Sequence, residues 1–236
     1  MTKNSLFTLL LLAALLCLTG RLVADPLAWQ LDYISKPLLM PLLFGYYRQQ
    51  MTAYRNTNWL EFISSGLFFA WLGDLFLMIA HGNKLLFITG LLCFLVMQVQ
   101  YIYHFNKQRF SGPSIFKEKP VFALPSLLLG IGFYGLLFAH LDPILKIAVG
   151  LYAVALSAMT LAAVQRYQKS SALSFRYLTC GAFLFMLSDM MIGMNNFLFE
   201  KGFYLAGFWI MLSYIVGQFL IVKGLLLHQQ SLNNPS

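Results

Sequence analysis

The sequence predicts an all-α integral membrane protein, and its composition supports this prediction in three ways. Apolar and aromatic residues make up 59% of the 236 residues, only 10% of the residues are charged, and the mean hydropathy is +0.71. A water-soluble domain would carry about 25% charged residues. Because a bilayer-spanning helix needs roughly 20 apolar residues, we expect about eight spans in one membrane domain, residues 1–236.

Eight apolar runs are expected to form the transmembrane helices. The runs are continuous and lack the period-two alternation of membrane strands. The first run is interpreted as a retained helix, although its basic start and leucine-rich centre resemble a signal peptide. The second is short, and we expect Pro37 and Pro41 to break it. The runs are residues 5–23, 31–47, 59–80, 85–105, 120–139, 143–164, 174–198 and 203–227.

Basic residues predict the orientation of these helices. Eleven Lys and Arg residues fall on one side of the predicted membrane and four on the other, and only Lys36 lies within a span. Since cytoplasmic loops carry the excess of positive charge, both termini are expected in the cytoplasm. The net charge of +8 is therefore assigned to membrane orientation and not to nucleic-acid binding. We expect a bacterial inner membrane, with the lipid bilayer as the protein's partner.

Two of the runs share a spacing that suggests an internal repeat. Gly66 precedes Asp74 by eight residues, Gly181 precedes Asp189 by eight, and a small residue stands before each aspartate. The offset between similar segments is about 115 to 117 residues. Two four-helix halves of this kind would cross the membrane in the same direction, as parallel repeats. The candidate halves are residues 1–115 and 116–236.

Three charged residues lie well inside the predicted spans: Lys36, Asp74 and Asp189. A charge at membrane depth is costly and indicates function by default. At 1.5 Å per residue the three lie roughly 8, 9 and 14 Å from the outer helix ends, so one shared cavity could hold them. Two carboxylates in such a cavity can serve as a general acid and a general base. The structural alternative is that Lys36 reaches the interface and each aspartate bonds a neighbouring helix.

Motifs for other chemistries are missing from the sequence. The four histidines lack HExxH spacing, and they fall at span ends or in the tail. There is no G-x-S-x-G elbow and no P-loop. Cys17, Cys93 and Cys180 lie in apolar runs and are interpreted as small buried hydrophobes. We therefore expect no metal and no cofactor.

Other polar residues also fall within spans. They are Gln98, Tyr101, Asn195, Tyr214 and Gln218. Tyr214 and Gln218 are four residues apart, so they share a helix face. Each of the five either bonds a neighbouring helix or lines a polar cavity beside the aspartates, and the sequence leaves both open.

An ordered set of these residues resembles the YhhN-like family of membrane proteins, the lysoplasmalogenases, over about 190 residues. The set is Lys36-Pro37-Leu38-Leu39, Gly73-Asp74, Gly90, Phe94, Tyr101, Tyr152, Met159, Gly181-Ala182, Ser188-Asp189, Asn195, Phe197, Tyr214 and Gln218. One departure is Gln98, where the family usually has histidine. Glutamine cannot carry a proton near neutral pH, which places a histidine-based mechanism in doubt.

The resemblance implies hydrolysis of the vinyl ether bond of a 1-alkenyl lysophospholipid. The products would be a fatty aldehyde and glycerophosphocholine or glycerophosphoethanolamine. Asp74 and Asp189 would be the acid and the base, in either order. Lys36 would pair with one aspartate or meet the lipid phosphate. Lys36 and the five polar residues would bind substrate.

Three other functions remain open from the sequence. A proton-coupled transporter of a lipid or small molecule also fits buried carboxylates and parallel halves. A lysophospholipase-type hydrolase would release a fatty acid in place of an aldehyde. A structural protein would use the aspartates only to join helices.

Overall fold

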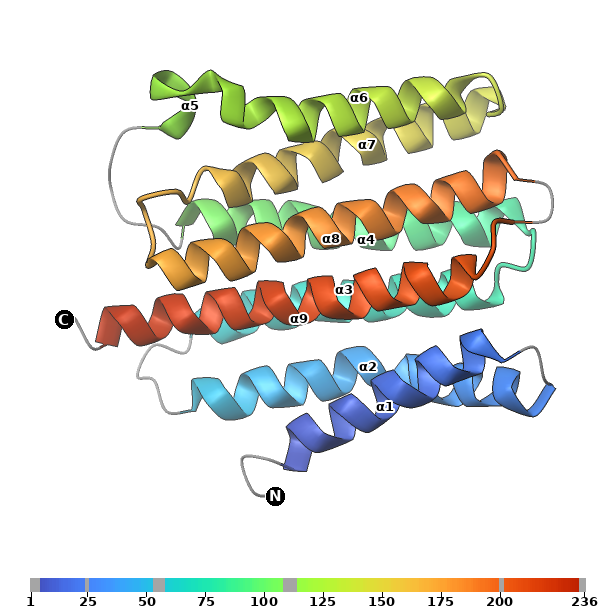
Figure 1. The fold of residues 1–236 in the computed structure, drawn as a ribbon, viewed down its shortest axis with the longest axis horizontal. Helices are drawn as coiled ribbons and strands as arrows, with labels where there is room; N and C mark the ends of the chain where they lie inside the picture. The colour runs from blue at the N-terminus through green and yellow to red at the C-terminus, as the bar shows by residue number, and fades with distance from the viewer. Residues whose placement is uncertain (1–4, 24–25, 53–57, 108–113, 200–201, 234–236) are drawn as a thin grey trace.

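The computed structural model describes residues 5–23, 26–52, 58–107, 114–199 and 202–233, which are almost entirely helical and include no strand. The long helices run side by side as one elongated bundle (Figure 1). The all-α prediction is confirmed. The long helices are α1 (Ser5–Leu22), α2 (Pro26–Met51), α3 (Asn58–Ile79), α4 (Lys84–Lys107), α6 (Leu124–Phe138), α7 (Pro143–Val164), α8 (Ala172–Phe197) and α9 (Ala206–Asn233). Before α6 lie the short α5 (Ile115–Glu118) and a 3₁₀ turn (Pro120–Ala123).

Six helices of the described chain are long and apolar enough to cross a membrane. They are α1, α4, α6 with its preceding 3₁₀ turn, α7, α8 and α9. The apolar stretch of α3 within the described residues is shorter, Ile63–Ile79, and α2 carries Asp32, Lys36 and Arg48. Six of the eight predicted spans thus have the required length and composition. For α2 and α3 the spanning assignment remains a prediction.

The prediction of a short second helix broken by prolines is wrong. α2 continues from Pro26 to Met51 through Pro37 and Pro41. Pro41 has no N–H, so the Pro37 carbonyl one turn earlier lacks its helical donor. Trp71 on α3 supplies the replacement, because its indole Nε1 donates to that carbonyl at 2.9 Å. A neighbouring helix thereby restores the lost bond and ties α2 to α3.

Glycines allow the closest helix contacts of the bundle. On α8 and α9, a Cβ at Gly181 would lie 2.7 Å from the Gly217 carbonyl oxygen, so both positions must stay small. On α3, a Cβ at Gly73 would lie 2.7 Å from the ring of Phe94 on α4. Small residues at helix crossings are typical of membrane bundles. Gly73 immediately precedes Asp74, so the close α3–α4 crossing falls at the level of that carboxylate.

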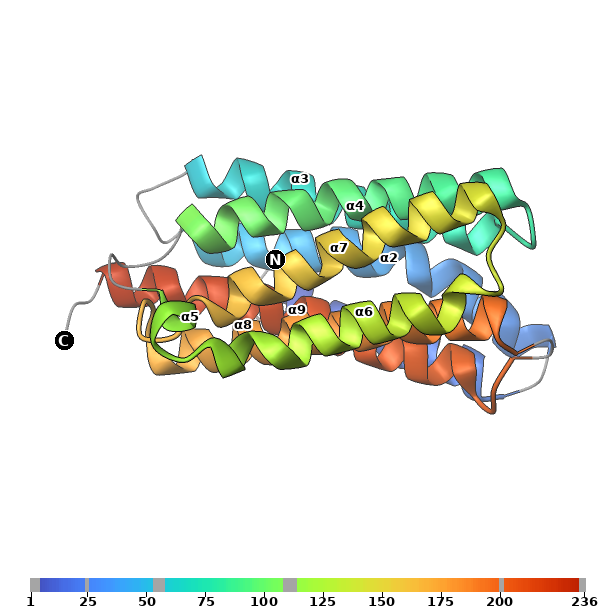
Figure 2. The same ribbon diagram turned by 90° about the horizontal axis from the view of Figure 1, so that it is seen from above.

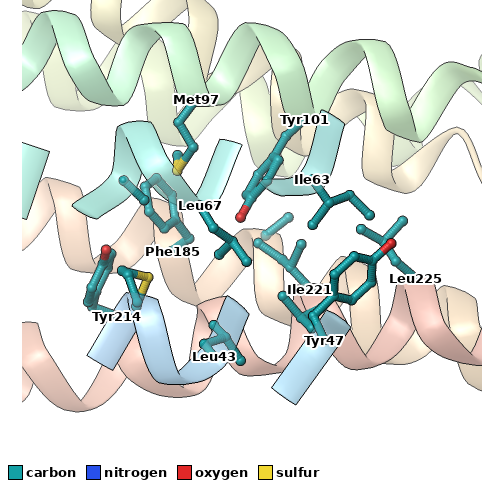
Figure 3. Packing of buried hydrophobic residues seen from close by; sticks show 14 of the residues in the cluster. Leu43, Tyr47, Ile63, Leu67, Met97, Tyr101, Phe185, Tyr214, Ile221 and Leu225 are labelled. Atoms are coloured by element: carbon teal, nitrogen blue, oxygen red, sulfur yellow. The ribbon is translucent and has the colours of Figure 1, made fainter. Parts of the chain in front are cut away.

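The largest apolar core is formed by buried residues of α1, α2, α3, α4, α7, α8 and α9. Leu43, Leu67, Met97, Phe185 and Ile221 are among its fully or almost fully buried members (Figure 3). A second cluster packs α6 and α7 against the ends of α4 and α8. α6 and α7 form the upper edge of the bundle in Figure 1, and in the view from above α7 runs obliquely across the other helices (Figure 2). The two clusters meet beside Asp189, which lines a cavity between them.

Two expectations about single residues need correction. Cys17 is buried as expected, but Cys93 is partly exposed and Cys180 is exposed on the apolar surface; all three are free thiols. His228 does not lie in a tail, because α9 extends to Asn233 and buries it. The continuous apolar run ends before α9 does, so hydropathy underestimates the length of this helix.

Candidate active site

Asp74 lies where three helices meet. It is on α3, is only 4% exposed, and accepts a hydrogen bond from the Tyr214 hydroxyl of α9 at 2.6 Å. The Lys36 ammonium of α2 lies 3.6 Å from the other carboxylate oxygen. Burial of a charge is tolerated when it is paired and hydrogen-bonded. Asp74 meets both conditions, since each oxygen has its own partner.

Asp189 lies in different surroundings. It is on α8, is 7% exposed, and accepts a hydrogen bond from the Tyr152 hydroxyl of α7 at 2.5 Å. None of the ion pairs formed by the described residues includes Asp189. The carboxyl group also lines a small cavity of about 30 Å³, hereafter the apolar cavity, together with Phe133, Leu137 and Phe197. Asp189 therefore has a neutral donor and apolar walls but no described cation beside it.

The two Asp–Tyr pairs form one electrostatic cluster. The charge of Asp74 acts on both Asp189 and Tyr152, and the charge of Asp189 acts on Tyr214. Gln98 of α4 is fully buried beside Tyr152. Its amide interacts with the Tyr152 hydroxyl but makes no hydrogen bond of good geometry within the described residues. The structure thus brings Lys36, both aspartates, Tyr214 and Gln98 together.

Tyr101 and Gln218 form the next layer of the core. The Tyr101 hydroxyl of α4 donates to Gln218 Oε1 of α9 at 2.8 Å, and Gln218 Nε2 lies 3.3 Å from Met97 Sδ. Figure 3 places Tyr101 among packed apolar side chains, away from Tyr214. Both residues thus join α4 to α9 about one helical turn from the Asp74 pair.

Asn195 does not join the aspartates. It lies near the end of α8, about two helical turns beyond Asp189, where its side chain faces Gly202. It lines an open groove together with His140 and Arg21. Its position near the end of α8 therefore separates it from both aspartates.

A larger polar cavity lies at the predicted outer end of the bundle. It has a volume of about 540 Å³ and is lined by Arg21, Asp32 and Lys36, together with His81 and Lys84. We refer to it as the outer cavity. Four apolar residues line both this cavity and the apolar cavity: Leu77, Phe87, Ile192 and Phe197. The two spaces are therefore neighbours, one beside Lys36 and the other beside Asp189.

Sequence reasoning missed two parts of this site. Tyr152 entered only as one residue of a family pattern, and its contact with Asp189 was not foreseen. Asp32 was overlooked at the start of an apolar run, although it lies four residues before Lys36 and so shares a helix face with it. Asp32 accepts from Arg21 at 2.6 Å and from the Cys17 thiol at 3.1 Å. The spacing from Asp32 to Lys36 was the available signal.

The salt bridge between Lys84 and Asp142 lies on the rim of the site. Their charged atoms are 2.5 Å apart, and Asp142 also caps α7 by accepting from the backbone N–H groups of Ile144 and Leu145. The hydrogen bond from Lys84, followed by those from the backbone, lowers the pKa of the Asp142 carboxyl below its ordinary value. The bridge joins the start of α4 to the start of α7.

Fold and site together define an integral membrane protein with two buried, tyrosine-bonded aspartates. Among the described residues, no three His, Cys, Asp or Glu side chains converge as a metal site. That the protein needs no metal stays a prediction. The chain matches the sequence model of the YhhN family over residues 31–225 and belongs to that family. No curated protein and no solved structure is similar enough to the chain to match it.

Proposed function

We propose that this protein is a lysoplasmalogenase, which hydrolyses the vinyl ether bond of a 1-alkenyl lysophospholipid. The observation that carries the proposal is the pair of buried aspartates with unlike neighbours: Asp74 beside an ammonium group, and Asp189 beside a neutral hydroxyl and apolar walls. Membership of the YhhN family, which the sequence resemblance connects with this reaction, supports it. Vinyl ether hydrolysis needs one group that gives a proton and one that stays anionic.

In this proposal Asp189 is the general acid. Burial without a cation favours the neutral form of a carboxyl group. The Tyr152 hydroxyl occupies Oδ2, so the proton is carried by Oδ1. Asp189 gives this proton to the β-carbon of the vinyl ether, the C=C bond supplies the electron pair, and an oxocarbenium ion forms at the α-carbon.

Asp74 is the anionic partner. The Lys36 ammonium and the Tyr214 hydroxyl both stabilise its carboxylate form. The carboxylate faces the positive charge that develops on the substrate, and it accepts a proton from the attacking water. In the collapse of the resulting hemiacetal, Asp189 takes the proton of the hemiacetal hydroxyl, and Asp74 returns its proton to the glycerol oxygen as the C–O bond breaks. The products are a fatty aldehyde and the glycerol hydroxyl of the headgroup, one water is consumed, and both aspartates regain their starting states.

The two cavities suggest how the lipid lies. The outer cavity has cationic walls for a phosphate-containing headgroup. The apolar cavity, at about 30 Å³, has room for water beside Asp189 but not for an alkyl chain. The chain therefore enters by displacing apolar side chains such as Phe87 and Phe197, which line both spaces. Asn195 at the outer groove and Gln98 beside Tyr152 complete the proposed substrate contacts. Tyr101 and Gln218 join α4 to α9 about one helical turn from Tyr214 and thereby support its position.

The membrane architecture that we propose has eight spans in one domain, residues 1–236, with both termini in the cytoplasm of a bacterial cell. It is supported by α2 and α3 lying in the same bundle as the other long helices (Figure 1). At 26 and 22 residues, they are long enough to cross roughly 30 Å of hydrocarbon.

Two parallel repeats are also part of the proposal. The positions of Lys36, Asp74 and Gln98 correspond, about 116 residues later, to those of Tyr152, Asp189 and Tyr214. The packing recurs in the same way, since α3 packs on α4 as α8 does on α9, and α4 contacts α7 as α9 contacts α2. Each aspartate thus meets the second helix of its own half and faces the fourth helix of the other half.

The test is the identity of the product. Purified protein in detergent is incubated with 1-alkenyl and 1-acyl lysophosphoethanolamine in the presence of a chelator. We expect aldehyde from the alkenyl lipid and no fatty acid from the acyl lipid. Fatty acid from the acyl lipid would indicate a lysophospholipase. No product from either lipid, with proton-dependent flux in vesicles, would indicate a transporter.

A further inference from the structure

We infer that Arg21 of α1 binds the phosphate of the substrate headgroup, which makes α1 part of the substrate site. The inference rests on the proposed function, which it deepens. α1 lies outside the residues that match the family, 31–225. The family match alone therefore gives no reason to place a binding residue there.

Arg21 lies on the wall of the outer cavity. Its side chain is 26% exposed, and it lines both the outer cavity, with Lys36, and the open groove that runs past Asn195. A headgroup entering from either space therefore meets the guanidinium group. Gly207 of α9 leaves room for it, since a Cβ there would lie 2.9 Å from Arg21 Nη1.

The other two strong cations of the outer cavity are already engaged by carboxylates. The Lys36 ammonium lies against Asp74 in the catalytic cluster, and the Lys84 ammonium lies 2.5 Å from Asp142 at the rim. Arg21 also has a carboxylate partner, Asp32, but that contact is made through Nη2. A guanidinium group carries five N–H donors. Nε of Arg21 is buried and has no hydrogen-bond partner among the described residues. Because Asp32 engages only Nη2, the N–H groups of Nη1 remain to donate to a phosphate.

Asp32 orients this guanidinium group and does not itself meet substrate. It is only 2% exposed, with one oxygen 2.6 Å from Arg21 Nη2 and the other 3.1 Å from the Cys17 thiol. The contact from Asp32 holds one edge of the planar group, which leaves the remaining edges to form a fork toward phosphate oxygens. Asp32 is therefore a positioning residue.

The placement fits the length of the substrate. Arg21 and Lys36 line the same outer cavity, and the Lys36 ammonium lies 3.6 Å from Asp74, so a group bound at Arg21 lies on the same side of the site as this carboxylate. In a 1-alkenyl lysophospholipid, only the three glycerol carbons separate the phosphate oxygen from the vinyl ether oxygen. A phosphate held by Arg21 therefore sets the reacting bond close to the two aspartates.

The experiment compares two substrates that differ only in phosphate. Arg21→Gln and Arg21→Lys are assayed with 1-alkenyl lysophosphoethanolamine and with 1-alkenylglycerol, which has no phosphate. For Arg21→Gln we expect KM for the phospholipid to rise about tenfold, as for loss of a charged hydrogen bond, with kcat within about twofold. KM for 1-alkenylglycerol should not change, and Arg21→Lys should be intermediate.

Lys146→Gln is the matched control. Lys146 lies at the start of α7 on the same predicted face and contacts the Phe138 ring, 4.3 Å from its centroid. This variant loses the same charge and should keep both KM values. A soluble headgroup, glycerophosphoethanolamine, should inhibit turnover of the alkenyl lipid more strongly in wild type than in Arg21→Gln. Inorganic phosphate at the same concentration should not inhibit either protein.

Two results would overturn the inference: an unchanged KM for the phospholipid in Arg21→Gln, or an equal rise for both lipids. If wild type turns over neither alkenyl lipid, the proposed function fails separately. Binding then decides the inference, by native mass spectrometry with lysophosphatidylethanolamine and monoacylglycerol. Weaker binding of the phospholipid alone in Arg21→Gln supports it, and equal binding by wild type and variant contradicts it. If Arg21→Gln does not fold, Arg21→Lys carries the same comparison.

Discussion

The surroundings of Asp74 and Asp189 differ in one main respect. Both are buried, and both accept a short hydrogen bond from a tyrosine of another helix. Only Asp74 has an ammonium group, Lys36, at 3.6 Å. In the proposed repeat the position of Lys36 is taken by Tyr152 in the other half. One half thus supplies a cation where the other supplies a neutral hydroxyl.

Two carboxylates in nearly equivalent positions can therefore take different roles. Two like carboxylates in an apolar site separate in protonation when their neighbours differ. A cation beside one of them favours its ionised form, and the other then holds the proton. α3 and α8 both carry an aspartate. The difference arises because α2 carries Lys36 where α7 carries Tyr152.

The largest effect is expected from removing either carboxylate. Asp189→Asn should lower kcat by about 10³-fold or more, because a general acid contributes roughly 10² to 10⁴. Asp74→Asn should lower it comparably. Aldehyde release is the measurement, and Asp142→Asn, which makes the same chemical change at the rim, should stay near wild type.

Stability needs a separate control for Asp74. Its loss leaves Lys36 buried without a carboxylate, and breaking a buried pair costs about 3–5 kcal/mol. The double variant Asp74→Asn, Lys36→Met removes both charges and should fold better than Asp74→Asn while remaining inactive. Activity near wild type in either single aspartate variant would remove that residue from the mechanism.

The next effect concerns the cation that distinguishes the two halves. Lys36→Met should lower kcat roughly 10- to 100-fold, because Asp74 would then lack the charge that keeps it ionised. Lys36→Arg should retain more activity, since it keeps the charge. Steady-state kinetics on the alkenyl lipid would measure both. Equal activity of Lys36→Met and wild type would mean that the two aspartates do not depend on this difference.

A smaller effect, on stability, is expected from removing the tyrosine hydroxyls. A hydrogen bond to a charged group contributes about 1.5–3 kcal/mol and one between neutral groups about 0.5–1.5 kcal/mol. Tyr214→Phe should therefore reduce the free energy of unfolding more than Tyr152→Phe, because Asp74 is the ionised member. Denaturation in mixed detergent micelles would measure both values. The reverse order would contradict the assignment of charge.

The smallest effect lies at the rim. Asp142→Asn keeps a side-chain oxygen to cap α7 but loses its charge against Lys84, so the melting temperature should fall slightly. The Asp142 pKa is lowered in the folded state, so its contribution is fully present above its ordinary pKa of 3.8. It is lost as the pH falls through the lower folded-state value. Melting curves of the two proteins should therefore converge only in strong acid.

Much of the fold follows from the apolar runs. The predicted run 143–164 coincides with α7, and each of the other long helices overlaps a predicted run. The length of α2 was predicted wrongly, because the cost of Pro37 and Pro41 depends on whether a neighbour satisfies the freed carbonyl. Trp71 does so here, and no local pattern in the sequence announces that contact.

The site was predicted only in part. Lys36, Asp74 and Asp189 were identifiable because a charge stands out in an apolar run. Pairing of Lys36 with one aspartate was also expected, and Tyr214 was a candidate for lining the cavity beside them. Which aspartate each would meet could not be assigned, since Tyr214 meets Asp74 across 140 residues of chain. Asn195 looked equivalent to the other polar residues in sequence, but it lies at the outer end of α8. Arg21 was interpreted only as a charge outside the membrane.

Infrared difference spectroscopy can show whether Asp74 and Asp189 differ in protonation, and it needs no substrate. At neutral pH, the spectrum of wild type minus Asp189→Asn should contain the C=O stretch of a neutral carboxylic acid. The spectrum of wild type minus Asp74→Asn should contain carboxylate bands instead. A neutral-acid band that disappears in Asp74→Asn, or carboxylate bands in both difference spectra, would contradict the account.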